Sequence, residues 1–380
     1  MRDEEAPRPT RYPSDFAATA TDRRALLALS TLSGLTARKL LELAAVEGSA
    51  SACLAAVRKG RAGSRGDRTH VGGIDPDGVA ASVSACGARV IAWGDPEYPI
   101  SLMDLADPPA LLYARGRDLG SLVWRVAVVG SRRCSALGRD VAVDIGRSLA
   151  SAGACVVSGA ARGIDTGAHR GALDAAGTTV AVLGSGIDVL YPAGSRGLLQ
   201  EIEAAGAIVT EYPPGIPAEP FRFPARNRIV AGIARALVVV EGAAGSGSMI
   251  SVDHALDLGR EVFAVPGPVT SPLSEVPLAL IRDGAVMIRG ADDLLADLGL
   301  DVAPATLAGP SELPPDELRV FEGLRSPCLP DAVARAASVS IPEAVAALIR
   351  LELRGLVRNV GGRYERRLSP RGGTADAANA

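Results

Sequence analysis

The chain has 380 residues, 48% of them hydrophobic and 22% charged, which is typical of a globular protein with one large domain and one or two small ones. The formal net charge of −3 excludes a general electrostatic affinity for nucleic acid, so a polyanion would need a local concentration of basic side chains. Five isolated cysteines form no C-x-x-C pair, which argues against a zinc site or a disulfide framework and favours the reducing cytoplasm.

The N-terminal part of the chain is expected to be helical after a disordered start. Residues 1–21 are charged, contain proline and have no apolar run, so we expect disorder there and no signal peptide. Residues 22–90 are expected to form a small helical domain, with two periodic segments joined at Ser33-Gly34-Leu35 as a helical hairpin. No apolar run reaches membrane-spanning length, so no membrane association is expected.

Residues 91–299 are predicted to form an α/β domain with a parallel sheet. Short valine-rich runs alternate with helical segments, and such runs are typical of strands in a parallel sheet that is covered on both faces. The first helix carries Leu137, Val141, Ile145 and Leu149 at a spacing of four residues. The runs begin at Val126, Cys155, Thr179, Ala207, Ala236, Val262 and Val286.

The C-terminal part is expected to hold a second, smaller domain. Residues 300–314 are rich in proline and alanine and are interpreted as a linker, and residues 369–380 as a disordered tail. Residues 315–368 are expected to contain three helices followed by two strands around Gly361-Gly362, which is the order of a winged-helix domain.

The segments that follow the predicted strands are rich in glycine, serine and arginine. In an open parallel sheet, ligands bind at the carboxyl ends of the strands, so these residues should meet at one edge. Glycines let a ligand approach the backbone, and N–H groups, hydroxyls and guanidinium groups bind anions, although a glycine after a strand is also simply a turn. The predicted anion-binding residues are Gly130, Ser131, Arg132, Ser158, Gly159, Arg162, Gly163, Gly184, Gly186, Ser246, Gly247 and Ser248.

Several common ligand sites do not fit these segments. The chain lacks the three-glycine dinucleotide fingerprint and its later acidic residue, and it lacks the P-loop lysine. No His, Asp and Glu cluster has metal-ligand spacing, and His169 and His254 lie within helical stretches as surface or packing residues. We therefore expect no cofactor and no metal.

The stretch FRFPARNRIVAG places Arg226, Asn227 and Arg228 near the start of a helix. Cations there oppose the helix dipole, so an anion should compensate them, either a bound ligand or an internal carboxylate such as Glu211 or Glu241. Nearby Phe221, Phe223 and Tyr212 are typical of single-stranded nucleic-acid sites, where rings stack on bases, but they are equally typical of a buried core.

Together these segments resemble one family, the DNA-processing protein DprA (Smf) family. The matching motifs, in family order, are GSR at Gly130, SGAARGIDTGAHRGAL at Ser158, VAVLGSGIDVLYP at Val180, TEYPPG at Thr210, FPARNRIVAG at Phe223, VVEGAAGSGSMIS at Val239 and GREVFAVPG at Gly259. The resemblance implies a helical SAM-like or helix-hairpin-helix domain, an extended Rossmann-like domain that binds single-stranded DNA, and a winged-helix domain. It also implies a homodimer that loads RecA onto incoming DNA during natural transformation, without a catalytic step.

The resemblance carries over to particular residues. Arg132 and Arg162 match basic positions of the family's DNA pocket, Gly130, Ser131, Ser158 and Gly159 match its phosphate-binding backbone, and Arg226, Asn227 and Arg228 match its R-N-R motif. The chain departs from the family pattern at Val276 and Leu278, where small or polar residues are usual, and at Leu137, where an aromatic residue is frequent.

Two alternatives remain open from the sequence: a phosphoribohydrolase of the LOG type and a nucleotide-sensing module. The enzyme needs a glutamate after its glycine motif, whereas Glu241 precedes the glycines here, and Ile250 to Val252 offer no carboxylate. On the first interpretation, the anion at Gly130-Ser131-Arg132 is a DNA phosphate, with Ser131 capping a helix that begins near Ala136.

Overall fold

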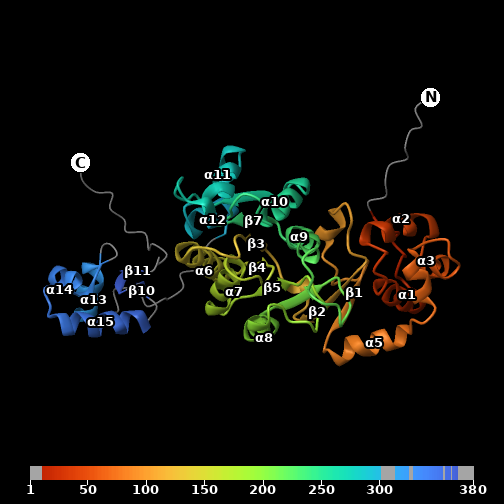
Figure 1. Cartoon of the computed structure of the whole chain (residues 1–380), viewed down its shortest axis with the longest axis horizontal. Coiled ribbons are helices and arrows are strands. Elements are labelled where there is room, and N and C mark those ends of the chain that lie inside the picture. Colours follow the sequence, from red (N-terminus) through yellow and green to blue (C-terminus); the bar gives the residue numbers. More distant parts are fainter. Residues whose placement is uncertain (1–10, 301–312, 325–327, 354–355, 361, 367–380) are drawn as a thin grey trace. The chain divides into compact units, whose positions relative to one another are not determined.

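A computed structural model describes residues 11–300, 313–324, 328–353, 356–360 and 362–366. The chain divides into two compact units, Met1–Leu294 and Leu295–Ala380, which are described separately (Figure 1). No single helix among these residues is long and apolar enough to cross a membrane, and two sharply bent helix pairs reach such a length only when both members are counted together.

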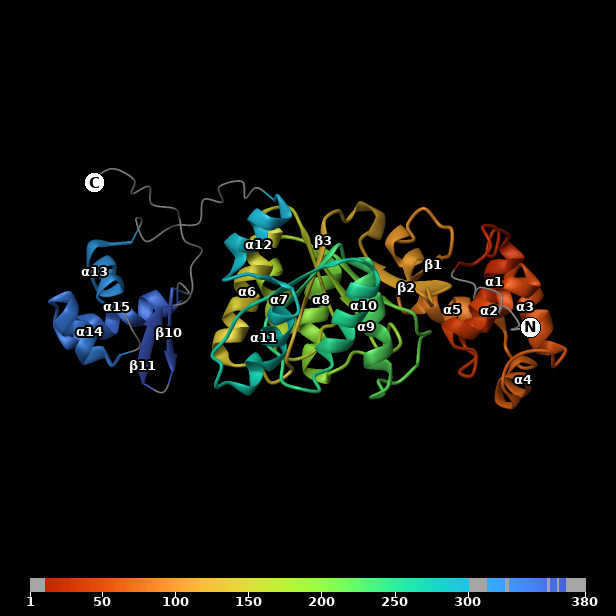
Figure 2. The same ribbon diagram turned by 90° about the horizontal axis from the view of Figure 1, so that it is seen from above.

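The first unit begins with five short helices, each started by a side-chain cap. They are α1 (Ala20–Ser30), α2 (Ala37–Glu47), α3 (Ala50–Arg58), α4 (Arg65–Val71) and α5 (Pro76–Ala85). Their N-cap residues are Thr19, Thr36, Ser49, Ser64 and Asp75, whose side chains accept hydrogen bonds from the first turn. The two helices predicted on either side of Ser33-Gly34-Leu35 are α1 and α2, but α1 packs mainly against α3 and α5, so the two do not form a packed hairpin. Both views place α1 near β1 (Arg89–Ala92) (Figures 1 and 2).

Part of the segment predicted to be disordered is ordered. Within 1–21, residues 11–21 are described, and Tyr12 and Phe16 are almost fully buried, with their ring centroids 4.7 Å apart. Tyr12 also packs edge-on against Trp93, which follows β1. The prediction failed because it weighed the charged residues and prolines and not these two aromatic rings, whose burial favours order. The remaining residues of that segment, 1–10, lie outside the described residues, as does the predicted tail.

A nine-stranded sheet forms the centre of the first unit, in the order β1-β2-β6-β5-β4-β3-β7-β8-β9. The seven strands numbered β3 to β9 pair with one another in parallel, as predicted. In contrast, β2 pairs antiparallel with β6, and β1 pairs antiparallel with β2. The strands are β1 (Arg89–Ala92), β2 (Leu111–Gly116), β3 (Arg125–Val129), β4 (Cys155–Ser158), β5 (Thr179–Val182), β6 (Ala207–Thr210), β7 (Ala236–Val239), β8 (Glu261–Ala264) and β9 (Val286–Met287).

Helices cover both faces of this sheet, with α6, α7 and α8 on one face and α9 and α10 on the other (Figure 1). Helices α6 and α7 approach so closely that a side chain on Gly146 or Gly171 would overlap the backbone of the other helix. Glycine at these two positions makes the close packing possible. The helices are α6 (Ala136–Ser151), α7 (Ile164–Asp174), α8 (Arg196–Ala205), α9 (Arg222–Ile233), α10 (Ser248–Asp257), α11 (Glu275–Arg282) and α12 (Ala291–Leu298), with 3₁₀ turns η1 (Ile100–Asp104), η2 (Leu119–Ser121), η3 (Ala193–Ser195) and η4 (Pro272–Ser274).

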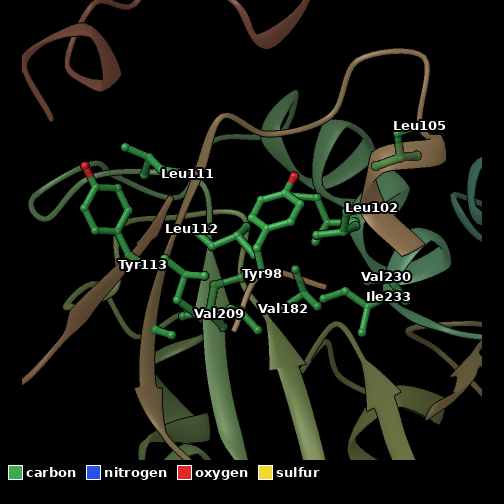
Figure 3. Packing of buried hydrophobic residues seen from close by; sticks show 14 of the residues in the cluster. Tyr98, Leu102, Leu105, Leu111, Leu112, Tyr113, Val182, Val209, Val230 and Ile233 are labelled. Carbon is green, nitrogen blue, oxygen red and sulfur yellow. The ribbon is translucent and has the colours of Figure 1, made fainter. Parts of the chain in front are cut away.

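The connection between β1 and β2 packs over α9 and the sheet. Tyr98, Leu102 and Leu105 come from this connection and lie near Val182 of β5 and Ile233 of α9 (Figure 3). Gly232 makes the contact possible, because a Cβ there would come within 2.7 Å of Leu102. The helical region and the sheet therefore share one continuous core, which also includes Phe16.

A buried ion cluster crosses the same contact. Arg228 of α9 is 5% exposed and donates from Nε to Asp107 at 3.2 Å and from Nη2 to Glu211 at 2.6 Å. Burial alone would lower the pKa of Arg228, but the two carboxylates reverse this and raise it. The cluster joins the β1–β2 connection, the end of β6 and α9, so it holds together three segments that are distant in the sequence.

The two histidines noted in the sequence lie within helices, as expected. His254 is half-buried in α10, and His169 is fully buried in α7. The Thr179 hydroxyl donates to the Val156 carbonyl, so Nδ1 of His169, 2.7 Å from that hydroxyl, must donate its own hydrogen. Nε2 has no partner, and burial lowers the pKa of His169 to about 3.

The second unit has the predicted order of three helices followed by a β-hairpin. These are α13 (Pro315–Gly323), α14 (Pro330–Ala337), α15 (Ile341–Leu353), β10 (Val357–Val360) and β11 (Arg363–Arg366). Phe321, Val333, Leu348 and Tyr364 form part of its own hydrophobic core. The arrangement is that of a winged-helix domain, while residues 301–312 of the predicted linker lie outside the described residues.

We expect Arg228→Ala to lower the free energy of unfolding by about 3–5 kcal/mol, because two carboxylates lose their buried cation. Urea unfolding of the full chain followed by tryptophan fluorescence measures this, since both tryptophans, Trp93 and Trp124, lie in the first unit. Arg196→Ala, at an exposed arginine of α8, is the control and should change stability by less than about 0.5 kcal/mol. Equal effects of the two substitutions would contradict the assignment.

We expect His169 to make the protein less stable as the pH falls below its ordinary pKa of 6.5. The unfolded chain takes up a proton there, while the folded chain takes it up only near its lowered pKa, so stability falls by about 1.4 kcal/mol per pH unit between the two values. His169→Asn retains an N–H donor towards Thr179 and removes the titration. Parallel pH dependences of unfolding for the two proteins would show that His169 contributes nothing.

Candidate nucleic-acid interface

A cleft of about 770 Å³ opens at the carboxyl edge of the sheet, between the loop after β3 and the loop after β7. Strand order changes direction at this point, because the chain runs from β3 outward to β6 and then returns to β7 on the other side of β3. This is where ligands bind in doubly wound sheets. The predicted residues that line it are Gly130, Ser131, Arg132, Gly159, Arg226, Asn227, Ser246, Gly247 and Ser248.

The other predicted residues do not line this cleft. Ser158 is buried and donates its hydroxyl to the Val128 carbonyl at 2.7 Å, which links β4 to β3. Gly184 packs closely against Phe223, and Gly186 against the Pro213 carbonyl. Gly163 and Arg162 lie in the loop after β4, where Gly163 has a φ of 83° and Arg162 is exposed.

The loop after β3, residues 130–135, is held on both sides. The Ser131 N–H donates to the Glu241 carbonyl at 2.7 Å, and the Ser131 carbonyl accepts from the Ile164 N–H at 3.3 Å. Gly163 must lack a side chain, because a Cβ there would lie 2.2 Å from the Ser131 carbonyl oxygen. The loops after β3, β4 and β7 therefore lock one another in place.

The N-terminus of α6 corrects the expectation about its cap and its anion. Ser135, not Ser131, caps the helix by accepting from the Gly138 N–H at 2.9 Å. The Glu241 carboxylate accepts from the Ser135 N–H at 2.8 Å and from its hydroxyl at 2.6 Å, and it fits because Gly138 has no side chain. The N-terminus of α6 is therefore already bound to an anionic group of the protein itself, the Glu241 carboxylate.

Exposed cations lie on the loops after β3 and β4. Arg132 and Arg133 line the cleft, Arg162 lies in the loop after β4 outside the cleft lining, and none of the three forms an ion pair within the described residues. The Arg132 guanidinium lies over the Phe223 ring, 4.9 Å from its centroid, and Phe223 lies 5.3 Å from Tyr191. We call Arg132, Phe223 and Tyr191 the inner stack; it presents one cation and two ring systems to the cleft.

Arg226 has a different position from these exposed arginines. It is 4% exposed, and Nη1 donates to the carbonyls of Gly159, at 2.7 Å, and Val182. Gly159 is required there, because a Cβ would lie 2.4 Å from the guanidinium. Burial lowers the pKa of Arg226 to about 10, while nearby Asp165 opposes that decrease. Its hydrogen bonds hold the ends of β4 and β5 at the floor of the cleft.

The R-N-R motif therefore divides into three separate roles. Arg226 supports the cleft floor, and Asn227 donates from Nδ2 to the Gly247 carbonyl at 3.1 Å, joining α9 to the loop after β7. Arg228 points to the Asp107 and Glu211 cluster and does not line the cleft. For Arg228 the internal salt bridge to Glu211, weighed in the sequence analysis, is the arrangement observed.

The loop after β7, residues 240–247, forms the opposite wall. The hydroxyls of Ser246 and Ser248 lie 2.8 Å apart, and the Ser246 hydroxyl also accepts from the Ser248 N–H at 3.3 Å, where α10 begins. The Gly242 carbonyl accepts from the Val276 N–H at 2.9 Å, and Val276 is buried beneath this loop. The wall thus presents serine hydroxyls at a helix N-terminus, groups that bind anions.

The lining residues that the sequence analysis missed include three that are charged or aromatic: Arg133, Asp165 and Tyr191. Arg133 directly follows the GSR motif and Tyr191 lies in the VAVLGSGIDVLYP motif, so position after a strand could have identified them. Asp165 is the carboxylate among the lining residues; it accepts from the N–H groups of Gly159 at 3.1 Å and Ala161 at 3.3 Å, and burial raises its pKa. No group of three or more potential metal ligands occurs in the described part of the chain.

The winged-helix arginines show no comparable arrangement. Arg350 of α15 pairs with Asp316 at 2.8 Å and with Glu317 at 2.7 Å, while Arg363 is exposed on β11. Arg354 and the side chain of Arg358 lie outside the described residues.

Comparisons with known proteins give a consistent result. The family model for DNA recombination-mediator protein A matches residues 89–299, and the model for the DprA winged helix domain matches residues 303–363. Protein Smf of Escherichia coli (strain K12) is 37% identical over 280 residues, covering 71% of this chain and 75% of that protein. DNA processing protein DprA of Streptococcus pneumoniae is 41% identical over 201 residues, covering 53% of this chain and 71% of that protein.

Two solved structures are also similar. The X-ray structure of DprA from Streptococcus pneumoniae has a TM-score of 0.61 and 32% identity, and covers 73% of this chain and 98% of that one. DNA processing protein A from Helicobacter pylori, described for its single-stranded DNA binding mode, has a TM-score of 0.51 and 28% identity, and covers 56% of this chain and 95% of that one. The chain belongs to the DNA recombination-mediator protein A (DprA/Smf) family.

Proposed function

We propose that this protein binds single-stranded DNA in the cleft and acts as a recombination mediator that performs no chemical step on the DNA. The observation that carries the proposal is the set of exposed arginines Arg132, Arg133 and Arg162, which form no ion pair within the described residues, together with the Phe223 ring under Arg132. Guanidinium groups bind phosphates, and ring faces stack on unpaired bases of any sequence. The Helicobacter pylori relative, described for binding single-stranded DNA, supports the same assignment.

Within the cleft, the DNA phosphate is proposed to lie between the two walls. The Glu241 carboxylate already occupies the N-terminus of α6. We therefore propose that the anion expected at Gly130-Ser131-Arg132 lies between Arg132 on one side and Ser246 to Ser248 on the other. Arg226 and Asn227 hold the floor and the second wall. Ser158, Gly159, Gly163, Gly184 and Gly186 are assigned to shaping the loops around the phosphate.

The wider role is proposed from family membership. It comprises protection of incoming DNA and loading of RecA during natural transformation, by a homodimer in the cytoplasm. Val276, one of the departures from the family pattern, is buried under the loop after β7. We therefore assign it to supporting the cleft wall and not to the dimer surface.

The enzyme alternative has less support. A phosphoribohydrolase needs a carboxylate that can reach the N-glycosidic bond of a bound nucleotide. The Glu241 carboxylate is hydrogen-bonded to Ser135 at the N-terminus of α6, and the Asp165 carboxylate is hydrogen-bonded to the backbone of the loop after β4. Neither carboxylate is free in this arrangement, so we do not propose catalysis.

We expect the protein to bind single-stranded DNA more tightly than blunt duplex, with little dependence on sequence, because ring faces are useful only to unpaired bases. The binding constant should fall with salt concentration, with a log–log slope of roughly −0.7 for each neutralised phosphate. Competition between labelled oligothymidylate and unlabelled duplex, repeated at several salt concentrations, measures both. Equal or tighter duplex binding would contradict the proposal.

We expect Arg132→Ala and Arg162→Ala each to weaken single-stranded DNA binding by about 1.5–3 kcal/mol, the value of one charge-assisted hydrogen bond. Arg196→Ala removes an exposed arginine of α8, outside the cleft lining and outside the loops after β3, β4 and β7, and should leave binding unchanged. Thermal unfolding of each variant provides the second measurement. A large drop in melting temperature together with the lost binding would mean that the residue is structural.

A further inference from the structure

We propose that Phe221 is a second base-stacking site, outside the cleft, which holds one nucleotide of the DNA strand after it leaves the inner stack. This inference rests on the proposed single-stranded DNA binding and extends it to the path of the strand. The site is formed by Phe221, Arg222 and Tyr212, which we call the outer stack. Its ligand is an unpaired nucleobase of any identity.

The exposure of Phe221 is the first observation. It keeps 65% of its accessible surface, although the chain has only five phenylalanines and the aromatic content is 3%. Its position just before α9 gives no packing reason for so large an apolar ring, because the buried residues of that helix begin at Arg226. An exposed ring beside a cleft is a surface available for a ligand.

The ring is also supported from behind. The Arg222 guanidinium lies between two aromatic rings, 5.0 Å from the Phe221 centroid and 5.2 Å from the Tyr212 centroid. Arg222 is itself held by Glu219 at 3.0 Å and by the Pro217 carbonyl at 3.1 Å. Because its charge is paired with Glu219, Arg222 orients the ring and is not assigned to a phosphate. A ring held in this way loses little conformational freedom when a base stacks on it.

The outer stack continues the cleft. Pro220 and Pro224, on either side of it in the sequence, both line the cleft, and Phe223 of the inner stack is two residues away. Phe221 and Arg222 of the outer stack and Phe223 of the inner stack thus lie on one short stretch of chain at the start of α9. Four of the chain's few aromatic residues, Tyr191, Tyr212, Phe221 and Phe223, belong to these stacks. Rings at successive positions along a strand are typical of single-stranded DNA binding.

The test uses the full-length protein and oligothymidylates lengthened by one nucleotide at a time. For the wild type, affinity should rise until the outer stack is filled. Phe221→Ala should bind the shortest oligonucleotides, which fill only the cleft, as well as the wild type does. It should bind the longer ones about tenfold more weakly, the effect of losing one base-stacking contact. Phe221→Trp should restore the wild-type profile.

Controls separate this inference from the proposed function. Val46→Ala removes an exposed apolar side chain from α2 and should change nothing. If the wild type binds no single-stranded DNA, the proposed function fails. If it binds and Phe221→Ala has the same affinity at every length, or the same deficit at every length, the outer stack is not a base site. Wild-type affinity of Phe221→Ala for all DNA together with a loss of self-association would instead assign Phe221 to a protein contact.

Discussion

The cleft depends on one residue, Glu241, which joins its two walls. The Glu241 carbonyl accepts from the Ser131 N–H, and its carboxylate binds the N–H and hydroxyl of Ser135, so the loop after β7 is tied to the loop after β3 at two points. The same carboxylate neutralises the start of α6, which would otherwise attract any nearby anion. As a result the space for an external anion lies between the walls, where Arg132 and the serines of the opposite loop face each other.

The arginines of this chain fall into two groups that the overall charge does not distinguish. Arg226 and Arg228 are buried and bind carbonyls or carboxylates of the protein, whereas Arg132, Arg133 and Arg162 are exposed and unpaired within the described ranges. The buried cations hold the floor of the cleft and join distant segments, and the folded protein loses stability if the partners of these cations are removed. Exposed cations cost the fold little and can exchange water for phosphate. Rigidity and binding are thus provided by different side chains.

The sequence predicts the sheet well, because valine runs and helical spacing are local properties, and the convergence of the following loops is a consequence of parallel topology. It predicts individual roles less well. Residues two apart on a helix are separated by about 200°, so Arg226 and Arg228 cannot face the same site, and the spacing alone could have shown this. The capping of α6 by Ser135 could not be predicted, because it depends on Glu241, which is distant in the sequence. Order at Tyr12 likewise depends on Trp93.

The groups that line the cleft also limit what kind of recognition is possible. Guanidinium groups and serine hydroxyls at a helix N-terminus are groups that bind phosphate oxygens, which are the same at every nucleotide. The rings of the inner and outer stacks match the faces of unpaired bases, and every base has such a face. Reading a sequence would need donors and acceptors placed against base edges, and Asn227, the amide best placed for this, is already bound to Gly247. These groups favour recognition that does not depend on sequence, as the proposed binding of single-stranded DNA requires.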